Sequence, residues 1–119
     1  MDENEISKQI VDAALEVHKS LGPGLLESVY EEALCYELNL RQLKFERQKH
    51  VPVVYKGVRL ESPLRLDLLV ENLVIVECKA VEQNQALWQM QTLTYLRMCG
   101  LKLGLVINFG ALLLKHNIH

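Results

Sequence analysis

The stretch from Leu64 to Lys79 constrains the fold of this 119-residue chain more than any other segment. Apolar residues alternate with other residues on both sides of Glu71-Asn72, which is the pattern of two β-strands joined by a tight turn. A two-residue loop would mix the faces of these strands, whereas a three-residue loop keeps their apolar residues together. The second register places Asp67 opposite Glu77. We therefore predict that these two carboxylates are direct cross-strand neighbours.

In this register the side chains divide between a core face and a partly charged face. The core face is predicted to carry Leu64, Leu66, Leu68, Val70, Val74, Val76 and Cys78. The other face is predicted to carry Arg65, Asp67, Leu69, Ile75, Glu77 and Lys79. Leu66 is then opposite Cys78, Arg65 is opposite Lys79, and Asn72 suits a left-handed backbone in the loop.

Periodicity in the rest of the chain predicts three helices and further strands. Helices are expected over residues 3–21, 25–40 and 84–99, and strands over 51–55, 58–61, 64–70, 73–79 and 103–109, with one more strand after Gly110. The first helix carries an apolar line of Ile6, Ile10, Ala13, Ala14, Val17 and Leu21 and ends at Gly22-Pro23-Gly24. This order of elements predicts an α/β (α+β) fold with a mixed sheet flanked by helices. Because no repeat or linker divides the sequence, residues 1–119 are expected to form a single domain.

Charge is unevenly distributed along the chain. The net charge is −2, but residues 1–40 contain nine acidic and two basic residues, and residues 41–59 contain six basic residues and one acidic residue. The basic block is a candidate anion-binding site, and the alternative is a solvated loop and strand edge.

Cysteine usage and hydropathy indicate the cellular compartment. Three cysteines without a CxxC pair favour reduced thiols and a cytoplasmic protein. The longest apolar runs are shorter than the roughly 18–20 residues of a membrane helix. The acidic N-terminus, residues 1–5, is unlike a secretory signal, so we expect neither export nor a membrane span.

The predicted carboxylate pair is suited to metal chemistry. Two carboxylates about 5 Å apart repel each other unless a cation or a proton lies between them. Magnesium or manganese would relieve this repulsion. Lys79, two residues after Glu77 on the same face, could orient or deprotonate a water or stabilise charge on a phosphorane. The arrangement suits phosphodiester hydrolysis, and its alternative is a plain salt bridge of Lys79 with Asp67 and Glu77.

Two motifs carry a family resemblance. Asp67, followed after nine residues by Glu77-Cys78-Lys79, resembles the D…ExK signature of the PD-(D/E)XK nuclease superfamily. The sequence GLLESVY at residues 24–30 matches the motif that names the GxxExxY protein family. Other similar stretches are residues 10–30, 45–48, 55–60, 65–80, 91–96 and 103–110. The resemblance implies a restriction-endonuclease-like core with a mixed sheet of four to five strands, and a metal-dependent nuclease that acts on DNA or, less favoured, on RNA.

The resemblance also implies a set of metal ligands. Asp67 and Glu77 would bind Mg²⁺ or Mn²⁺, with the backbone carbonyl of Cys78 as a third ligand. Glu27 would be the additional helical acid, reaching the metal directly or through water. The alternative role of Glu27 is an acid that stabilises a helix N-terminus.

Other catalytic roles follow from the same resemblance. Lys79 would be the catalytic lysine, and Gln91 and Tyr95, which match a Q-xxx-Y element, would line the same cleft. Their alternatives are a surface amide for Gln91 and ordinary helix-to-sheet packing for Tyr95. Trp88 stands where the family often has a histidine, and Cys78 stands where it usually has leucine or valine.

Possible partners complete the sequence-based hypothesis. Arg47, Lys49 and Arg65 are candidate contacts to the phosphates of a nucleic acid. The competing hypothesis is a non-catalytic nucleic-acid-binding or regulatory module that retains the nuclease fold, because the chain is small and its first third is acidic. A homodimer presenting two sites is a third possibility. His116 and His119 are either a zinc site or part of a frayed tail.

Overall fold

Two strands of the central sheet flank the predicted Glu71-Asn72 turn, and helices cover both faces of the sheet. A computed structural model describes residues 1–83 and 85–111. The helices are α1 (Glu3–Leu21), α2 (Glu27–Leu40) and α3 (Ala86–Cys99), and the sheet strands are β1 (Phe45–Val51), β4 (Leu64–Val70), β5 (Val74–Lys79) and β6 (Leu103–Asn108). A separate hairpin, formed by β2 (Val54–Tyr55) and β3 (Val58–Arg59), connects β1 to β4 along the chain.

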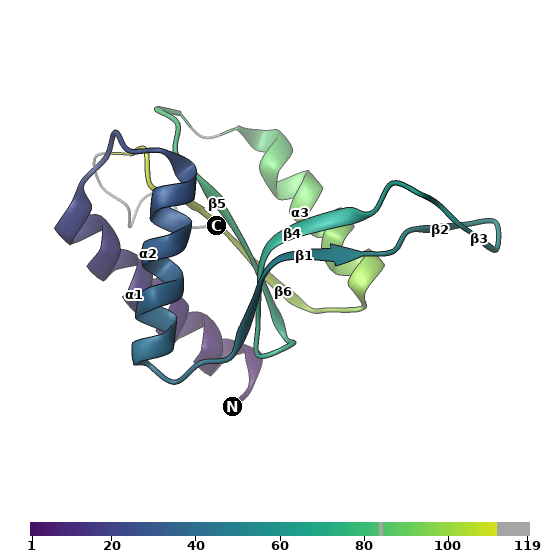
Figure 1. Cartoon of the computed structure of the whole chain (residues 1–119), viewed down its shortest axis with the longest axis horizontal. Coiled ribbons are helices and arrows are strands. Elements are labelled where there is room, and N and C mark those ends of the chain that lie inside the picture. Colours follow the sequence, from purple (N-terminus) through teal and green to yellow (C-terminus); the bar gives the residue numbers. More distant parts are fainter. Residues whose placement is uncertain (84, 112–119) are drawn as a thin grey trace.

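The sheet is mixed, as the element order predicts. Its strand order is β1-β4-β5-β6. The first two pairings are antiparallel, and β5 and β6 are parallel and joined through α3. Helices α1 and α2 lie on one side of the sheet and α3 lies on the other (Figure 1). The predicted α+β fold, with a four-strand sheet among the described residues flanked by helices, is confirmed and is consistent with a restriction-endonuclease-like core.

Helix α1 follows the predicted bounds because both of its ends are capped. The Asp2 carboxylate accepts a hydrogen bond of 2.9 Å from the Glu5 N–H at the start of the helix. Gly22, with a φ of 69°, ends it. The predicted apolar line is buried except for Leu21, which is 41% exposed. No helix in residues 1–83 and 85–111 is long and apolar enough to cross a membrane.

Tyr30 anchors the turn between α1 and α2. Its ring is fully buried and stacks on Phe109, with ring centroids 4.8 Å apart. Its hydroxyl donates a hydrogen bond to the Gly22 carbonyl and accepts one of 3.1 Å from the Leu25 N–H. Because Leu25 is held in this turn, α2 begins at Glu27 rather than at residue 25.

The register predicted for β4 and β5 is confirmed over the pairs that form. Leu68 pairs with Val76, and Val70 pairs with Val74, across a three-residue loop. Glu71 and Asn72 both have a positive φ, of 52° and 57°. The ladder ends before Asp67 and Glu77, so the expected pairs Leu66–Cys78 and Arg65–Lys79 are not part of it.

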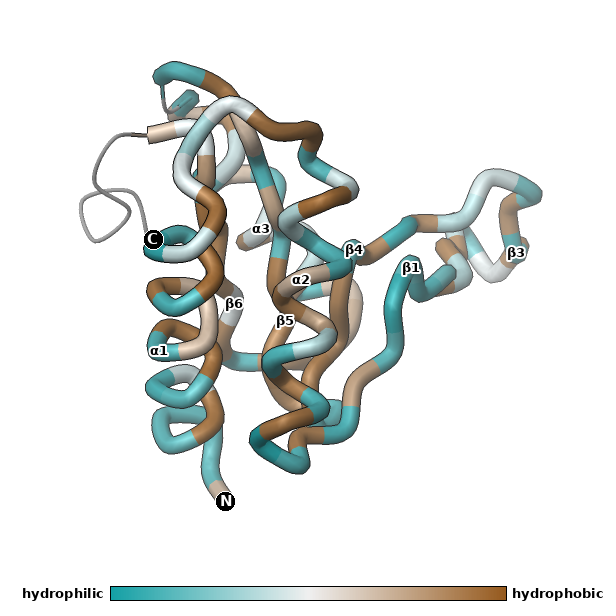
Figure 2. Tube along the Cα trace, turned by 60° about the vertical axis from the view of Figure 1, so that its left-hand side comes forward, coloured by the Kyte–Doolittle hydropathy of each residue, from teal (hydrophilic) through white to brown (hydrophobic). Residues whose placement is uncertain are grey.

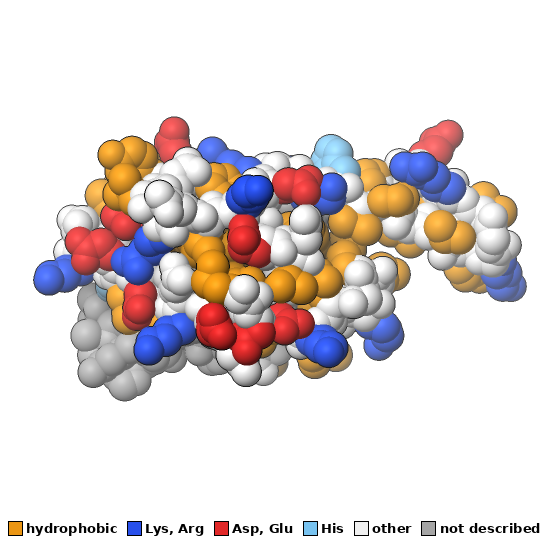
Figure 3. All heavy atoms as spheres, turned by 90° about the horizontal axis from the view of Figure 1, so that it is seen from below, with side chains coloured by type: hydrophobic (Ala, Val, Ile, Leu, Met, Phe, Trp, Pro, Cys, Tyr) orange, Lys and Arg blue, Asp and Glu red, His pale blue; other side chains and the backbone are white. Residues whose placement is uncertain are grey.

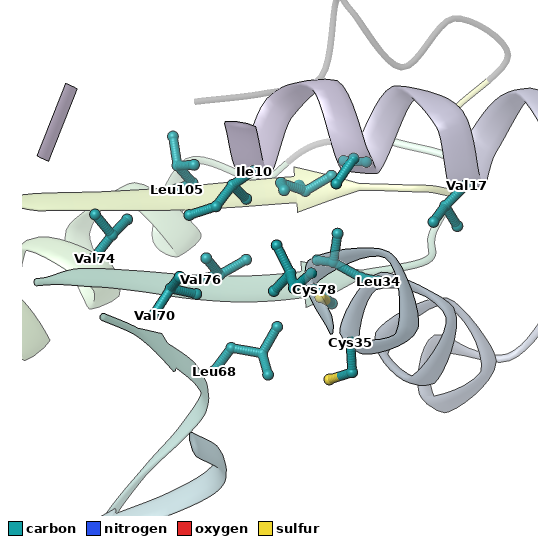
Figure 4. Close-up of a cluster of buried hydrophobic side chains, with 14 of the residues drawn as sticks. Ile10, Val17, Leu34, Cys35, Leu68, Val70, Val74, Val76, Cys78 and Leu105 are labelled. Atoms are coloured by element: carbon teal, nitrogen blue, oxygen red, sulfur yellow. The ribbon is translucent and has the colours of Figure 1, made fainter. Parts of the chain in front are cut away.

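The core is divided by the sheet into two clusters. The larger one joins α1 and α2 to the sheet and is shown in Figure 4; it includes Ile10, Leu34, Leu68, Val76, Cys78 and Leu105. The smaller one contains Leu66, Leu69 and Ile75, packed against α3. The prediction that Leu64 and Leu66 share a face with Leu68 is therefore wrong. Gln48, opposite Asp67 on β1, has a φ of 53°, and the regular alternation breaks at this position.

The middle of the chain differs most from the sequence-based expectation. Strand β1 begins at Phe45, inside the basic block, six residues before the predicted start. Its side chains lie mostly at the surface, so no apolar alternation marks it. The predicted turn at Lys56-Gly57 is confirmed, and it closes a short hairpin that projects from the body (Figure 2). The predicted start of the third helix at residue 84 and the predicted strand after Gly110 fall on or extend into positions outside the described residues.

Replacing Tyr30 with Phe is expected to lower the free energy of unfolding by about 1–2 kcal/mol, because two hydrogen bonds in the α1–α2 turn are lost while the ring stacking remains. Urea denaturation followed by circular dichroism measures this change. Tyr36→Phe is the matched control, because Tyr36 lies on the same helix and is 65% exposed; its effect should stay within about 0.5 kcal/mol. Equal stabilities of the two variants would contradict the anchoring role of Tyr30.

Candidate functional site

Asp67 and Glu77 are cross-strand neighbours, as predicted, and each is bonded to the backbone of the opposite strand. The Asp67 N–H donates a hydrogen bond of 2.8 Å to Oε2 of Glu77. The Cys78 N–H donates one of 2.9 Å to Oδ2 of Asp67. The two carboxylates thus occupy the place where the β4–β5 ladder would continue. Because the backbone holds both side chains, their positions do not depend on a salt bridge.

The β1 strand is also interrupted beside Asp67. Gln48, the residue that would pair with Asp67, turns its side chain to α2, where its amide donates a hydrogen bond of 2.7 Å to Glu31. The guanidinium of Arg47 donates to the same carboxylate oxygen at 3.2 Å. Asp67 therefore lies in a gap in the sheet, with regular pairing missing on both sides.

Glu31 was not among the predicted site residues. It is 4% exposed, on the inward face of α2, one helical turn after Glu27. The spacing of four residues from Glu27 was the available signal, since side chains four apart share a helix face. Its contacts with Arg47 and Gln48 make it the link between α2 and the interrupted part of β1.

The carboxylate pair has the chemistry of a divalent-cation site. The side chains of Asp67 and Glu77 also lie within hydrogen-bonding distance of each other, so a proton or a cation can be shared between them. Burial, followed by the charge of Asp67, raises the pKa of Glu77 from 4.5 to about 8. A cation between the two groups would favour the ionised form of Glu77. Mg²⁺ and Mn²⁺, which prefer oxygen ligands, fit this donor set.

Glu27 lies close to the pair without joining it in a single cluster. Partial burial, the charge of Asp67 and that of Glu31 raise the pKa of Glu27, and the charge of Lys79 opposes them. No group of three or more acidic, histidine or cysteine side chains within residues 1–83 and 85–111 is arranged to hold a metal. A shared metal would therefore be held by Asp67 and Glu77, with Glu27 placed beside them at the start of α2.

Lys79 shares the strand face of Glu77 and contacts an aromatic ring. Its ammonium lies 5.7 Å from the centre of the Trp88 ring. The ion pairs found in the described part of the chain do not include Lys79, so the alternative of a direct salt bridge with Asp67 and Glu77 is not observed. Trp88 thus has a structural role next to the lysine.

The chain that follows Lys79 is held by the end of β6. The Phe109 N–H donates a hydrogen bond of 2.7 Å to the Lys79 carbonyl. The buried Asn108 side chain accepts hydrogen bonds from the N–H groups of Val81 and Gly110, at 3.1 and 3.0 Å. A Cβ at Gly110 would lie 2.2 Å from the Val81 carbonyl oxygen, so only glycine allows this close approach. Asn108 was not among the predicted site residues.

Tyr95 and Gln91 are placed differently relative to the carboxylates. Tyr95 is half-buried on α3; burial, followed by the charges of Glu77 and Asp67, raises the pKa of its hydroxyl, which keeps it a hydrogen-bond donor. Gln91, one turn earlier on α3, is exposed. No hydrogen bond or ion pair between Gln91 and the carboxylates is found among the described residues.

The three predicted phosphate contacts also differ in their surroundings. Arg47 is paired with Glu31. Lys49 pairs with Glu46 at 2.8 Å. Arg65 is exposed and pairs through its backbone with His50 of β1. His116 and His119 lie outside the described residues. Of the predicted basic contacts, Arg65 is thus the one whose charge has no acidic partner among the described ion pairs.

Replacing Glu77 with Gln is expected to flatten the pH dependence of stability when EDTA removes divalent cations. Because the folded-state pKa of about 8 exceeds the ordinary 4.5, the stability that the protonated carboxyl contributes is complete below pH 4.5 and is lost as the pH rises through 8. Glutamine still accepts the Asp67 N–H and does not ionise. The loss of unfolding free energy between pH 5 and pH 8 should therefore be smaller in the variant by about 2–4 kcal/mol.

Urea denaturation at the two pH values provides the measurement. Glu61→Gln, at an exposed position, is the matched control and should retain the wild-type pH dependence. An equal loss of unfolding free energy between pH 5 and pH 8 in wild type and in Glu77→Gln would contradict the raised pKa of Glu77.

Comparison with known families agrees with this geometry. A sequence profile described as the PD-(D/E)XK nuclease superfamily matches residues 4–119, which is nearly the whole chain and includes all the site residues above. No curated protein and no solved structure matches the chain. This family match agrees with the sheet topology and with the Asp67…Glu77-Cys78-Lys79 pattern. The chain belongs to the PD-(D/E)XK nuclease superfamily.

Proposed function

We propose that the protein hydrolyses phosphodiester bonds in a nucleic acid, with DNA favoured, in a reaction that requires Mg²⁺ or Mn²⁺. The observation that carries the proposal is the pair of carboxylates held by crossed hydrogen bonds between β4 and β5, with their side chains within hydrogen-bonding distance of each other. Repulsion between these groups disfavours their joint ionisation without a cation. The site is therefore arranged to bind one.

In this proposal the metal is held by Asp67 and Glu77, together with the backbone carbonyl of Cys78. When bound, it would polarise the scissile phosphate and lower the pKa of a water molecule. Glu27 would hold or orient water next to the metal, because it lies beside Asp67 and outside the ligand pair. The Cys78 side chain is fully buried in the core and takes no part.

Lys79 and the two residues of α3 complete the proposed catalytic set. The Lys79 ammonium would orient the attacking water and stabilise the negative charge that develops on the phosphate. Trp88 restricts where that ammonium can lie. Tyr95, which stays protonated, would donate its hydroxyl hydrogen to the substrate, and Gln91 would meet the substrate at the exposed edge of the helix.

Substrate binding is assigned to Arg65, Arg47 and Lys49. Arg65 is the most available of the three, because Arg47 and Lys49 would each have to leave a carboxylate partner to reach a phosphate. The acidic helices at the other end of the chain would repel a polyanion. The three cysteines among the described residues are free thiols, which supports a reducing, cytoplasmic location.

We also assign the chain to the GxxExxY subgroup of the superfamily. Each of the three residues that the motif specifies has a separate physical role in the structure. Gly24 has a φ of 102°, which favours glycine; Glu27 lies beside the carboxylate pair; and Tyr30 anchors the α1–α2 turn. These three roles together position the start of α2 next to the site.

The direct test is cleavage of supercoiled plasmid, linear duplex, single-stranded DNA and RNA with Mg²⁺, Mn²⁺ or EDTA. Wild type should cleave at least one DNA substrate only with a metal. Asp67→Asn and Lys79→Ala should each lower the rate at least about 100-fold. Lys102→Ala, at an exposed position outside the site, is the control and should change the rate less than about twofold. Equal rates for wild type and Lys79→Ala would refute the assigned mechanism.

A non-catalytic nucleic-acid-binding or regulatory module is the second candidate. The observation that favours it is the position of Lys79, whose ammonium lies over Trp88 and makes no ion pair with the carboxylates. Such a module would retain the fold and bind nucleic acid without cleaving it.

Calorimetric titration with Mn²⁺ separates the two candidates. The nuclease proposal expects binding that Asp67→Asn abolishes and that Glu27→Gln weakens by about tenfold, as for a residue that orients metal-bound water. Glu5→Gln, an exposed acid on α1, is the control and should leave the affinity unchanged. Absence of binding, or binding that Asp67→Asn does not alter, would favour the non-catalytic module.

A further inference from the structure

Part of the charge segregation in the sequence becomes a separation in space. Residues 1–40, with nine acidic and two basic residues, form α1 and α2. Residues 41–59, with six basic residues and one acidic residue, form β1 and the β2–β3 hairpin. The molecule is 46 Å long, and the helices and the hairpin lie at opposite ends of this long axis (Figure 1). Arg41 and Arg47 of the basic block pair with Glu37 and Glu31 of α2, whereas the hairpin cations Lys56 and Arg59 lie away from the acidic helices.

The hairpin end carries an exposed apolar surface. We call residues 54–60 the arm; all of them are exposed. Its large apolar side chains are Val54, Tyr55, Val58 and Leu60, which are 65%, 60%, 61% and 42% exposed. Figure 3 shows hydrophobic and basic side chains together along this projection. A two-stranded hairpin without a core is only marginally stable in water, so a partner surface that buries its apolar side chains would stabilise the arm.

The two cations of the arm are also without acidic partners. Lys56 lies over its neighbour Tyr55, with its ammonium 5.4 Å from the ring centre. Neither Lys56 nor Arg59 belongs to an ion pair among the described residues. A partner for the arm should therefore combine an apolar groove with acidic side chains at its rim.

The helical end of the molecule has a groove of this kind. A hollow of about 470 Å³ runs between α1 and α2 and is lined by Glu16, Val17, Ser20, Leu21, Val29, Glu32, Ala33, Tyr36 and Glu37. Its apolar lining includes Leu21, Val29 and Tyr36, which are 41%, 38% and 65% exposed. Glu16 and Glu32 are exposed beside them and form no ion pair among the described residues. Tyr36 and the arm's Tyr55 are thus both uncovered in a single copy.

We propose that two copies of this chain form a two-fold dimer in which the arm of each copy lies in the α1–α2 groove of the other. A two-fold axis makes both contacts equivalent, so one dimer covers both arms and both grooves. Lys56 and Arg59 then face Glu16 and Glu32 of the other copy. The four exposed apolar side chains of the arm then contact the apolar lining of the groove in the other copy.

The chemistry of the arm favours a second copy over a nucleic acid as its occupant. Four exposed apolar side chains outnumber the two cations, whereas phosphate-binding surfaces are dominated by cations and polar groups. A nucleic acid would also leave the groove uncovered, because the acidic rim repels phosphate. The second copy covers both surfaces with a single arrangement.

Sedimentation velocity tests the proposal without reference to activity, so its outcome is independent of whether the protein cleaves nucleic acid. Wild type should have the mass of two chains at micromolar concentration. The arm variant Lys56→Glu/Arg59→Glu and the groove variant Glu16→Lys/Glu32→Lys should each be monomeric, with an at least 30-fold higher dissociation constant, because like charges would then meet at the contact. Lys8→Glu/Lys102→Glu, at exposed positions outside both surfaces, changes the net charge as the arm variant does and should remain dimeric.

Mixing the two monomeric variants is the most specific experiment. In the mixed dimer, the reversed arm meets the reversed groove and the native arm meets the native groove, so the two-chain mass should return. Circular dichroism confirms that each variant is folded. A monomeric wild type, or a dimer that neither variant weakens, would overturn the proposal. A third outcome would also overturn it: all proteins have the mass of one chain, and the arm variant loses affinity for a labelled DNA duplex. The arm would then be a nucleic-acid contact.

Discussion

The crossed hydrogen bonds between Asp67 and Glu77 are the interaction on which the site depends. Each carboxylate accepts an N–H group of the opposite strand, so the acids replace part of the β4–β5 ladder. A ladder bond holds only backbone together, whereas these bonds also fix the directions of two acidic side chains. They also bring the two carboxyl groups within hydrogen-bonding distance of each other. As a consequence, the burial of Glu77, followed by the charge of Asp67, raises the pKa of Glu77 to about 8.

The surrounding structure keeps this gap in the sheet open. Gln48 adopts a left-handed backbone and turns to Glu31 of α2, which removes the β1 partner of Asp67. Helix α2 is in turn positioned by Tyr30, through its stacking on Phe109 and its hydrogen bonds to the α1–α2 turn. Phe109 and Asn108 also hold the chain after Lys79. One network therefore connects the helical motif, the carboxylates and the lysine.

Local sequence signals predicted much of the fold. The bounds of α1, the end of α3 at Gly100 and the turn at Glu71-Asn72 follow from caps, glycines and alternation, which act over a few residues. Strand β1 was placed too late, because its exposed polar residues carry no alternation. Leu64 and Leu66 were assigned to the wrong cluster, because the alternation of β4 breaks near Asp67, beside Gln48 of β1 with its left-handed backbone. Such contacts between distant segments have no local signature.

By itself, the sequence determined the register of β4 and β5, and with it the approach of Asp67 to Glu77, because the two-residue period of strands allows only one pairing that keeps the apolar faces together. The tertiary structure decided how those acids are held, since hydrogen bonds to opposite backbones require the ladder to end at that point. It also decided that Arg47 and Gln48 donate hydrogen bonds to Glu31, and that Lys79 lies over Trp88. These pairings depend on which side chains from separate elements meet in space, and burial then requires each polar group to find a partner.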